Sequence, residues 1–280
     1  MANKIGVMQG RLLPKYKKQY QAHPAGYWHG EFAIAASLGL DLIEFIVDFD
    51  GIEENPVMSA DGITRISKVA ATTGVNVASI CADCFMAAPL HSADPASAKR
   101  SVEYLRRLIN NAAGLGVADI VIPCVDQSSL RSPDDTARFV AALESVLDAA
   151  ESSRINLSLE SDLDPDSFTR LLERFSSPRV TVNYDTGNSA SLGYNPREEL
   201  AAYGTRISDI HIKDRFEGGG SVPLGAGNVD FEAFFDALYP LHYRGSFILQ
   251  AYRDDEGVNI FRTQLAWIRP HIAAYGQRAK

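Results

Sequence analysis

Short apolar segments alternate with longer amphipathic segments along the whole chain. The short segments carry β-branched and aliphatic residues at successive positions, a pattern typical of strands buried on both faces of a parallel sheet. Strands that alternate with helices are joined by right-handed crossovers and lie parallel in one sheet. Eight strands are predicted in this way: Ile5–Met8, Leu42–Val47, Val77–Cys81, Ile120–Pro123, Ile155–Glu160, Val180–Tyr184, Ile207–Ile212 and Phe247–Gln250.

The segments between these strands predict helices. The clearest lies between Pro95 and Leu115, where apolar residues recur at helical spacing from Val102 to Ala112. Asp94 is expected to cap its N-terminus, because a proline at the first helical position follows. The other predicted helices are Trp28–Leu38, Asp61–Thr73, Pro133–Ser152, Pro165–Phe175, Pro196–Tyr203, Phe231–Leu238 and Val258–Ala274.

Eight strand–helix units in 280 residues predict an α/β protein of the (β/α)8 TIM-barrel class. A doubly wound dinucleotide-binding sheet is disfavoured, because no Gly-x-Gly-x-x-Gly motif opens the first helix. No low-complexity linker interrupts the pattern, so residues 1–280 are expected to form a single domain. The run Gly218-Gly219-Gly220 is predicted to be a mobile loop.

Composition restricts the partners and the compartment. The chain has 27 Lys and Arg and 35 Asp and Glu, a net charge of −8 that opposes binding to a phosphate backbone, so we expect no nucleic-acid partner. No apolar stretch approaches the roughly 18 residues of a membrane-spanning helix, and the N-terminal residues do not resemble a signal peptide. The three cysteines cannot all pair. We therefore expect a cytoplasmic protein that does not bind a membrane.

The ends of the last four strands carry residues suited to a metal ion. In a TIM barrel the functional residues collect at the C-terminal ends of the strands, where Glu160, Asp185, His211 and Gln250 fall. Alone, each has an ordinary explanation as a helix cap, an ion-pair partner or a core histidine. Together they form a nitrogen and oxygen donor set for Mn²⁺, Mg²⁺, Co²⁺ or Zn²⁺, and packed carboxylates repel without a cation. We expect all four to bind one divalent metal ion.

Several cationic and polar side chains at or just beyond strand ends suit a sugar or its phosphate. The candidates from position alone are Gln9, Arg11, His91, Lys213, Arg215 and Arg253. A structural role for His91, which lies in the loop after the third strand, is equally open. Glu44 within the second strand is interpreted either as part of the pocket or as a buried partner of one of these cations.

Five stretches resemble the sugar-phosphate isomerase/epimerase group of xylose-isomerase-like TIM barrels. They are IGVMQGRL (5–12), GLDLIEFI (39–46), DTGN (185–188), HIKDR (211–215) and VPLGAGNVDF (222–231). The resemblance covers essentially the whole chain, and its most specific part is the pair formed by the last two stretches. It implies an enzyme that acts on a small sugar or sugar phosphate, and it leaves room for a homo-oligomer.

The resemblance also implies roles for individual residues. In the group, a divalent ion is held by a glutamate, an aspartate, a histidine and a further acid. The first three roles fall on Glu160, Asp185 and His211. The fourth falls on Gln250, where many relatives carry glutamate, and Asn188 occupies the place of a substrate-binding histidine.

The glutamine changes the expected chemistry. In the group, the ion polarises a carbonyl and stabilises an enediolate formed by proton abstraction at the neighbouring carbon. Glu160 is the expected catalytic base, whereas the amide of Gln250 cannot act as one. A single base favours aldose–ketose isomerisation over epimerisation, which would require a second acid/base. The candidates for that second group are Lys213, His91, Asp83 and Asp162.

Other functions remain open at this stage. Related barrels include dehydratases of inosose-type polyols, and a sugar-binding relative that has lost its activity would also fit Gln250. An apurinic endonuclease-like nuclease would need several additional histidines, whereas this chain has six in all and only His91 and His211 at predicted strand-end positions. The sequence names neither the sugar nor the ion.

Overall fold

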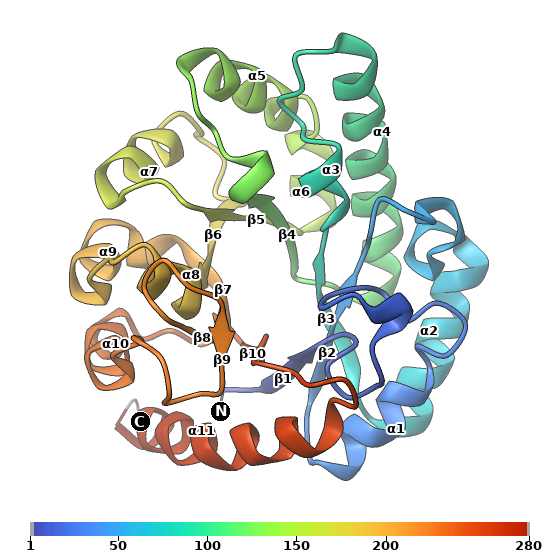
Figure 1. Cartoon of the computed structure of the whole chain (residues 1–280). Helices are drawn as coiled ribbons and strands as arrows, with labels where there is room; N and C mark the ends of the chain where they lie inside the picture. The colour runs from blue at the N-terminus through green and yellow to red at the C-terminus, as the bar shows by residue number, and fades with distance from the viewer. Residues whose placement is uncertain (1–2, 279–280) are drawn as a thin grey trace.

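A closed barrel of parallel strands lies at the centre of the computed structural model, which describes residues 3–278. The order around the barrel is β1-β10-β7-β6-β5-β4-β3-β2, and helices surround it (Figure 1). The strands are β1 (Ile5–Met8), β2 (Leu42–Ile46), β3 (Asn76–Cys81), β4 (Asp119–Cys124), β5 (Asn156–Ser161), β6 (Val180–Asp185), β7 (Ile207–Ile212) and β10 (Phe247–Leu249). The prediction of a (β/α)8 TIM barrel is confirmed.

The surrounding helices follow the predicted order. They are α1 (Gly30–Ser37), α2 (Ala60–Thr73), α3 (Cys84–Ala87), α4 (Pro95–Ala112), α5 (Pro133–Glu144), α6 (Leu147–Ser153), α7 (Pro165–Leu172), α8 (Thr186–Ser191), α9 (Pro196–Tyr203), α10 (Phe231–Leu238) and α11 (Val258–Arg278). Asp94 caps α4 as predicted, because its carboxylate accepts hydrogen bonds from the amides of Ala96 and Ser97. None of the helices within residues 3–278 has the length and apolar character to cross a membrane.

The structure adds local detail that the sequence did not predict. The helix predicted over 133–152 is two helices, because the backbone leaves helical geometry at Val146 (φ −121°) and buries that side chain completely. Helices α3 and α8 were not predicted, since four or six residues are too short to show a helical period. The run Gly218–Gly220 lies outside regular structure, in the turn between two short antiparallel strands that were not predicted, β8 (Asp214–Arg215) and β9 (Ser221–Val222).

The inside of the barrel is partly polar. An apolar layer there contains Met8, Leu42, Ile46, Cys81, Val121 and Ile248. Because side chains alternate along a strand, Glu44 points to the same side as Leu42 and Ile46, and it is completely buried. Asp209 and His211 of β7 are buried as well. The barrel interior therefore brings ionisable groups from distant strands to the base of the site.

Candidate active site and metal centre

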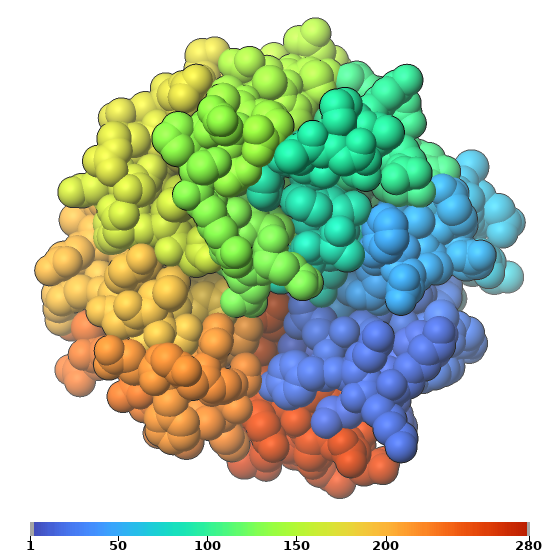
Figure 2. All heavy atoms as spheres, turned by 45° about the horizontal axis from the view of Figure 1, so that its top comes forward, coloured from blue at the N-terminus to red at the C-terminus, as the bar shows by residue number. Residues whose placement is uncertain are grey.

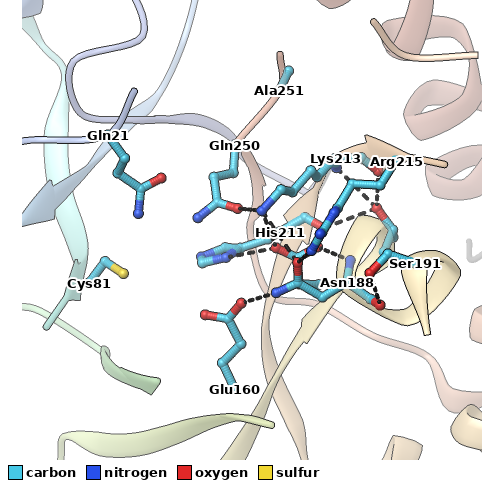
Figure 3. Close-up of polar contacts among 12 residues, drawn as sticks. Gln21, Cys81, Glu160, Asn188, Ser191, His211, Lys213, Arg215, Gln250 and Ala251 are labelled. Carbon is cyan, nitrogen blue, oxygen red and sulfur yellow. Dashed lines mark hydrogen bonds and ion pairs between the residues drawn. The ribbon is translucent and has the colours of Figure 1, made fainter. Parts of the chain in front are cut away.

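Three of the four predicted metal ligands lie together at the C-terminal ends of their strands. Glu160 on β5, Asp185 on β6 and His211 on β7 have ligand atoms that all lie within 4.8 Å of one another. The three side chains are buried, with exposed fractions of 6%, 5% and 0%. Figure 3 shows Glu160 facing the imidazole of His211.

The hydrogen bonds around this group leave one atom of Asp185 and one of His211 free. Asp185 Oδ1 accepts a hydrogen bond from the backbone amide of Asn188 (2.8 Å) and so caps α8. His211 Nε2 lies 2.8 Å from Glu44 Oε1. Asp185 Oδ2 and His211 Nδ1 are buried without a hydrogen-bond partner among the described residues.

These two atoms lie 3.8 Å apart. Two ligands that share one ion with bonds near 2.1 Å lie roughly 3 to 4 Å apart. Buried polar atoms are rarely left unpartnered, and the binding of an ion is one of the standard explanations for such atoms. The residues present therefore fit a divalent cation.

Burial and neighbouring charges give the two carboxylic acids, Glu160 and Asp185, different pKa values. Burial raises the pKa of Glu160 to about 7, and the nearby charge of Asp185 adds to the rise. Burial would also raise the pKa of Asp185, but Lys213 and His211 lower it to about 2. Asp185 is therefore the permanently charged member of the pair, whereas Glu160 can gain or lose a proton near neutral pH.

Asn188, the predicted substrate residue on α8, connects the carboxylate of Glu160 to two cations. Its amide nitrogen donates a hydrogen bond to Glu160 Oε1, and its Oδ1 accepts one from Arg215 Nη1 (2.9 Å). Lys213 Nζ lies 3.4 Å from the same oxygen. The predicted residues Asn188, Lys213 and Arg215 therefore lie on one wall of the site (Figure 3).

Gln250 lies beside this group and is bound to Lys213. Its Oε1 accepts a hydrogen bond from Lys213 Nζ (2.9 Å), and the ammonium group lies 3.6 Å from Asp185 Oδ2. An ion that also used Gln250 Oε1 would share this oxygen with the lysine. Ligation by Gln250 stays a prediction.

Two of the three arginines expected to bind substrate, Arg11 and Arg253, donate hydrogen bonds to loop backbone, and substrate binding by either stays a prediction. Arg11 Nε donates to the carbonyl oxygen of Ala251 (3.0 Å) and its Nη2 to Gln21 Oε1 (2.8 Å). Arg253 donates to the carbonyl oxygens of Gly10 (2.6 Å) and Leu13 (2.7 Å). Both side chains are almost fully buried. Their described contacts join the ends of β1 and β10, a structural role that sequence position alone did not distinguish from substrate binding.

Replacing Arg253 by Met is expected to lower the free energy of unfolding by about 2 to 3 kcal/mol, because the buried carbonyls of Gly10 and Leu13 lose hydrogen bonds from a charged group. Urea denaturation measures the change. The matched control is Arg262→Met, on an exposed part of α11, which should change stability by less than about 0.5 kcal/mol. A variant of native stability with a raised KM would instead show that Arg253 binds substrate.

The remaining two candidates lie in different surroundings. Gln9 is buried at the end of β1, where its Oε1 accepts from the amide of Ile46 (3.1 Å) and lies 2.9 Å from His23 Nδ1. His91 packs edge-on against Phe139 of α5, and this contact joins it to the helices around the barrel. A substrate role for either residue stays a prediction.

The wall opposite Asn188 contains Asp83, a predicted candidate for the second acid/base, together with Cys81 and Gln21, for which no role was predicted. Cys81 Sγ donates to Asp83 Oδ1 (3.0 Å), and Gln21 Nε2 donates to Asp83 Oδ2 (2.6 Å). Gln21 and Asp83 also line a chamber of about 660 Å³ formed by the loops after β1, β2 and β3. In Figure 2 the segments from both halves of the chain meet around a depression in this face. Gln21 lies in a long loop without periodicity, so no sequence signal pointed to it.

Comparison with known proteins identifies the family. The family model described as xylose isomerase-like TIM barrel matches residues 32–271. The SgbU protein of Escherichia coli strain K12 is 30% identical over 81% of this chain and 84% of its own. UlaE of Salmonella heidelberg strain SL476, an L-ribulose-5-phosphate 3-epimerase by name, is 28% identical over 91% of this chain and 94% of its own.

Solved structures share the fold over nearly the full length. An L-ribulose 3-epimerase structure superposes with a TM-score of 0.77 at 21% identity and covers 100% of this chain and 97% of its own. The IolI protein, solved with a zinc atom, has a TM-score of 0.78 at 15% identity and covers 97% and 99%. This chain therefore belongs to the xylose isomerase-like TIM-barrel family, in the sugar-phosphate isomerase/epimerase group that its motifs indicated, and is an isomerase-class enzyme.

Proposed function

We propose that the protein is a divalent-metal-dependent epimerase of a ketose or ketose phosphate, with Glu160 as the catalytic base. The observation that carries this proposal is the buried group of Glu160, Asp185 and His211 with its two unpartnered ligand atoms. The activity named for UlaE, epimerisation of L-ribulose 5-phosphate, supports the reaction type.

Glu160, Asp185 and His211 would hold the ion, and Gln250 Oε1 is the candidate fourth ligand. When bound, a divalent ion polarises a substrate carbonyl and stabilises the negative charge that develops on its oxygen. The nitrogen and oxygen donors suit Mn²⁺, Mg²⁺, Co²⁺ or Zn²⁺.

Glu160 has the properties of a general base. Without the ion, burial raises its pKa to about 7, and a bound cation would favour the charged form of the carboxylate, which can accept a proton. Asn188 holds one carboxylate oxygen, so the side chain keeps a defined orientation toward the centre of the site. The proton taken up by Glu160 comes from the carbon next to the substrate carbonyl, and the electron pair left behind moves toward the carbonyl oxygen.

Lys213 and Arg215 are the cations best placed to bind the substrate. Both contact Asn188, and Lys213 also lies near Asp185 and Gln250. An ammonium and a guanidinium on one wall suit either sugar hydroxyls or a phosphate. Phosphorylated and free ketoses are therefore both candidate substrates.

Aldose–ketose isomerisation is the second candidate reaction, and Gln250 is the observation that favours it. An amide at this position returns no proton, so a single carboxylate would move the proton between C1 and C2 on one face. Epimerisation needs a proton donor on the other face. The ammonium of Lys213, 2.9 Å from Gln250 Oε1, is the nearest such group to that amide in the described contacts.

Incubation with L-ribulose and L-ribulose 5-phosphate in D₂O tests the proposal. The Mn²⁺-loaded protein is expected to incorporate deuterium at C3 with inversion, as detected by NMR. Exchange confined to C1 and C2 would show the isomerase instead. Loss of water from a polyol panel would show a dehydratase, and the absence of exchange with both ketoses and of polyol dehydration would contradict an enzymatic function of this site.

A further inference from the structure

We propose that Glu44 is a positioning residue for His211: its carboxylate holds the imidazole by Nε2, so that Nδ1 faces Asp185 and Glu160. The inference rests on the proposed function as far as it concerns the ion. The orientation of the imidazole can be measured without the ion.

The geometry around Glu44 leaves its carboxylate little freedom. The side chain lies in the middle of β2, inside the barrel, and is 0% exposed. Its Oε1 lies 2.8 Å from His211 Nε2, and its Oε2 accepts a hydrogen bond from Ser79 Oγ (2.6 Å). Both oxygens are therefore engaged by groups on other strands, β7 and β3.

This arrangement decides which nitrogen of His211 can bind a cation. The bond to Glu44 requires a proton on Nε2, because a carboxylate only accepts hydrogen bonds. In the neutral imidazole the lone pair then belongs to Nδ1, which is the unpartnered atom 3.8 Å from Asp185 Oδ2. A carboxylate behind a metal-binding histidine selects the tautomer, orients the ring and increases its basicity.

An alternative position for the cation lies beside Asp209, on the other side of His211. Asp209 Oδ2 lies 3.8 Å from His211 Nε2 and accepts a hydrogen bond from Asn183 Nδ2 (3.2 Å). Glu44, Asp209 and His211 also have ligand atoms within 4.8 Å of one another, so a cation could be placed there instead. However, His211 Nε2 cannot donate to Glu44 and bind an ion at once, and Glu44 Oε2 is already used by Ser79.

Metal affinity of the full-length protein provides the first test. Zn²⁺ is added to the metal-free protein in competition with a chromophoric chelator. Glu44→Gln is expected to raise the Kd about 10- to 100-fold, the loss typical of a residue behind a metal ligand. Glu44→Asp keeps the charge and should restore part of the affinity; it also carries the test if Glu44→Gln does not fold.

Asp209→Asn is the matched control, because it is a similar exchange of a buried acid beside the same histidine. It should leave the Zn²⁺ Kd close to the native value if Glu44 acts by positioning His211. A loss as large as that of Glu44→Gln would overturn the proposal.

The imidazole itself provides the second readout. Protein labelled with ¹⁵N-histidine should show a slowly exchanging Nε2 proton for His211, and Glu44→Gln should shift this resonance or abolish its protection. An unchanged resonance and an unchanged Kd in Glu44→Gln would overturn the proposal. If the native protein binds no ion, the proposed function fails, whereas the resonance in the metal-free protein still tests whether Glu44 holds Nε2.

Discussion

Glu160→Gln is expected to lower kcat at least about 100-fold, the low end of what general acid–base catalysis contributes. The amide cannot take up a proton, although it has nearly the same size and still offers one oxygen to an ion. Much of the metal affinity should therefore remain. Deuterium incorporation into a ketose in D₂O and the Zn²⁺ Kd, measured on the same preparation, separate the two effects.

Glu199→Gln is the matched control for this variant. Glu199 is also a buried carboxylate, but its partners are the hydroxyl groups of Tyr184, Ser189 and Tyr203. Its exchange should leave kcat close to the native value once both variants are shown to be folded. If Glu160→Gln kept its rate of exchange, Glu160 would not be the base and another group would have to remove the proton.

His211→Ala is expected to abolish binding of the divalent ion or to weaken it by more than the 10- to 100-fold loss seen when a residue behind a ligand is changed. The variant removes the only nitrogen donor of the predicted set and leaves Asp185 Oδ2 without its neighbour. Elemental analysis of the purified protein and titration with Zn²⁺ measure the loss, and activity should fall in parallel.

His271→Ala provides the comparison for the loss of another imidazole. His271 stacks on Trp267 of α11, outside the barrel mouth. Its removal should leave the ion content unchanged. A fully loaded His211→Ala protein would contradict the assignment of the metal centre and leave the unpartnered atoms of Asp185 without an explanation.

The sequence could predict those residues of the candidate site whose position follows directly from the end of their own strand. Glu160, Asp185 and His211 each lie at the last or second-last position of their strand, and the parallel strands of a barrel bring such ends to one mouth. The local pattern of the chain is sufficient for that step. Asn188 lies four positions after the predicted end of β6. It also reaches this mouth, because α8 begins directly after the strand.

The functions of charged side chains could not be predicted in the same way. Arg11 and Arg253 lie at strand ends like Lys213 and Arg215, but carbonyl oxygens of the β1 loop and of the β10 end surround the first two. An arginine donates up to five hydrogen bonds, and its use depends on which acceptors the fold places within reach. Sequence position carries no information about those acceptors.

The sequence by itself determined the barrel, the order of its strands and the three strand ends that carry the metal-ligand candidates, because periodicity and strand-end chemistry are properties of short segments. Only the tertiary structure decided how these residues are used. The partner of His211 is Glu44, 167 positions earlier in the chain, and the free oxygen of Asp185 is selected by the cap that its other oxygen gives to α8. These choices depend on distances of a few ångströms between segments far apart in sequence, which arise only when the barrel closes.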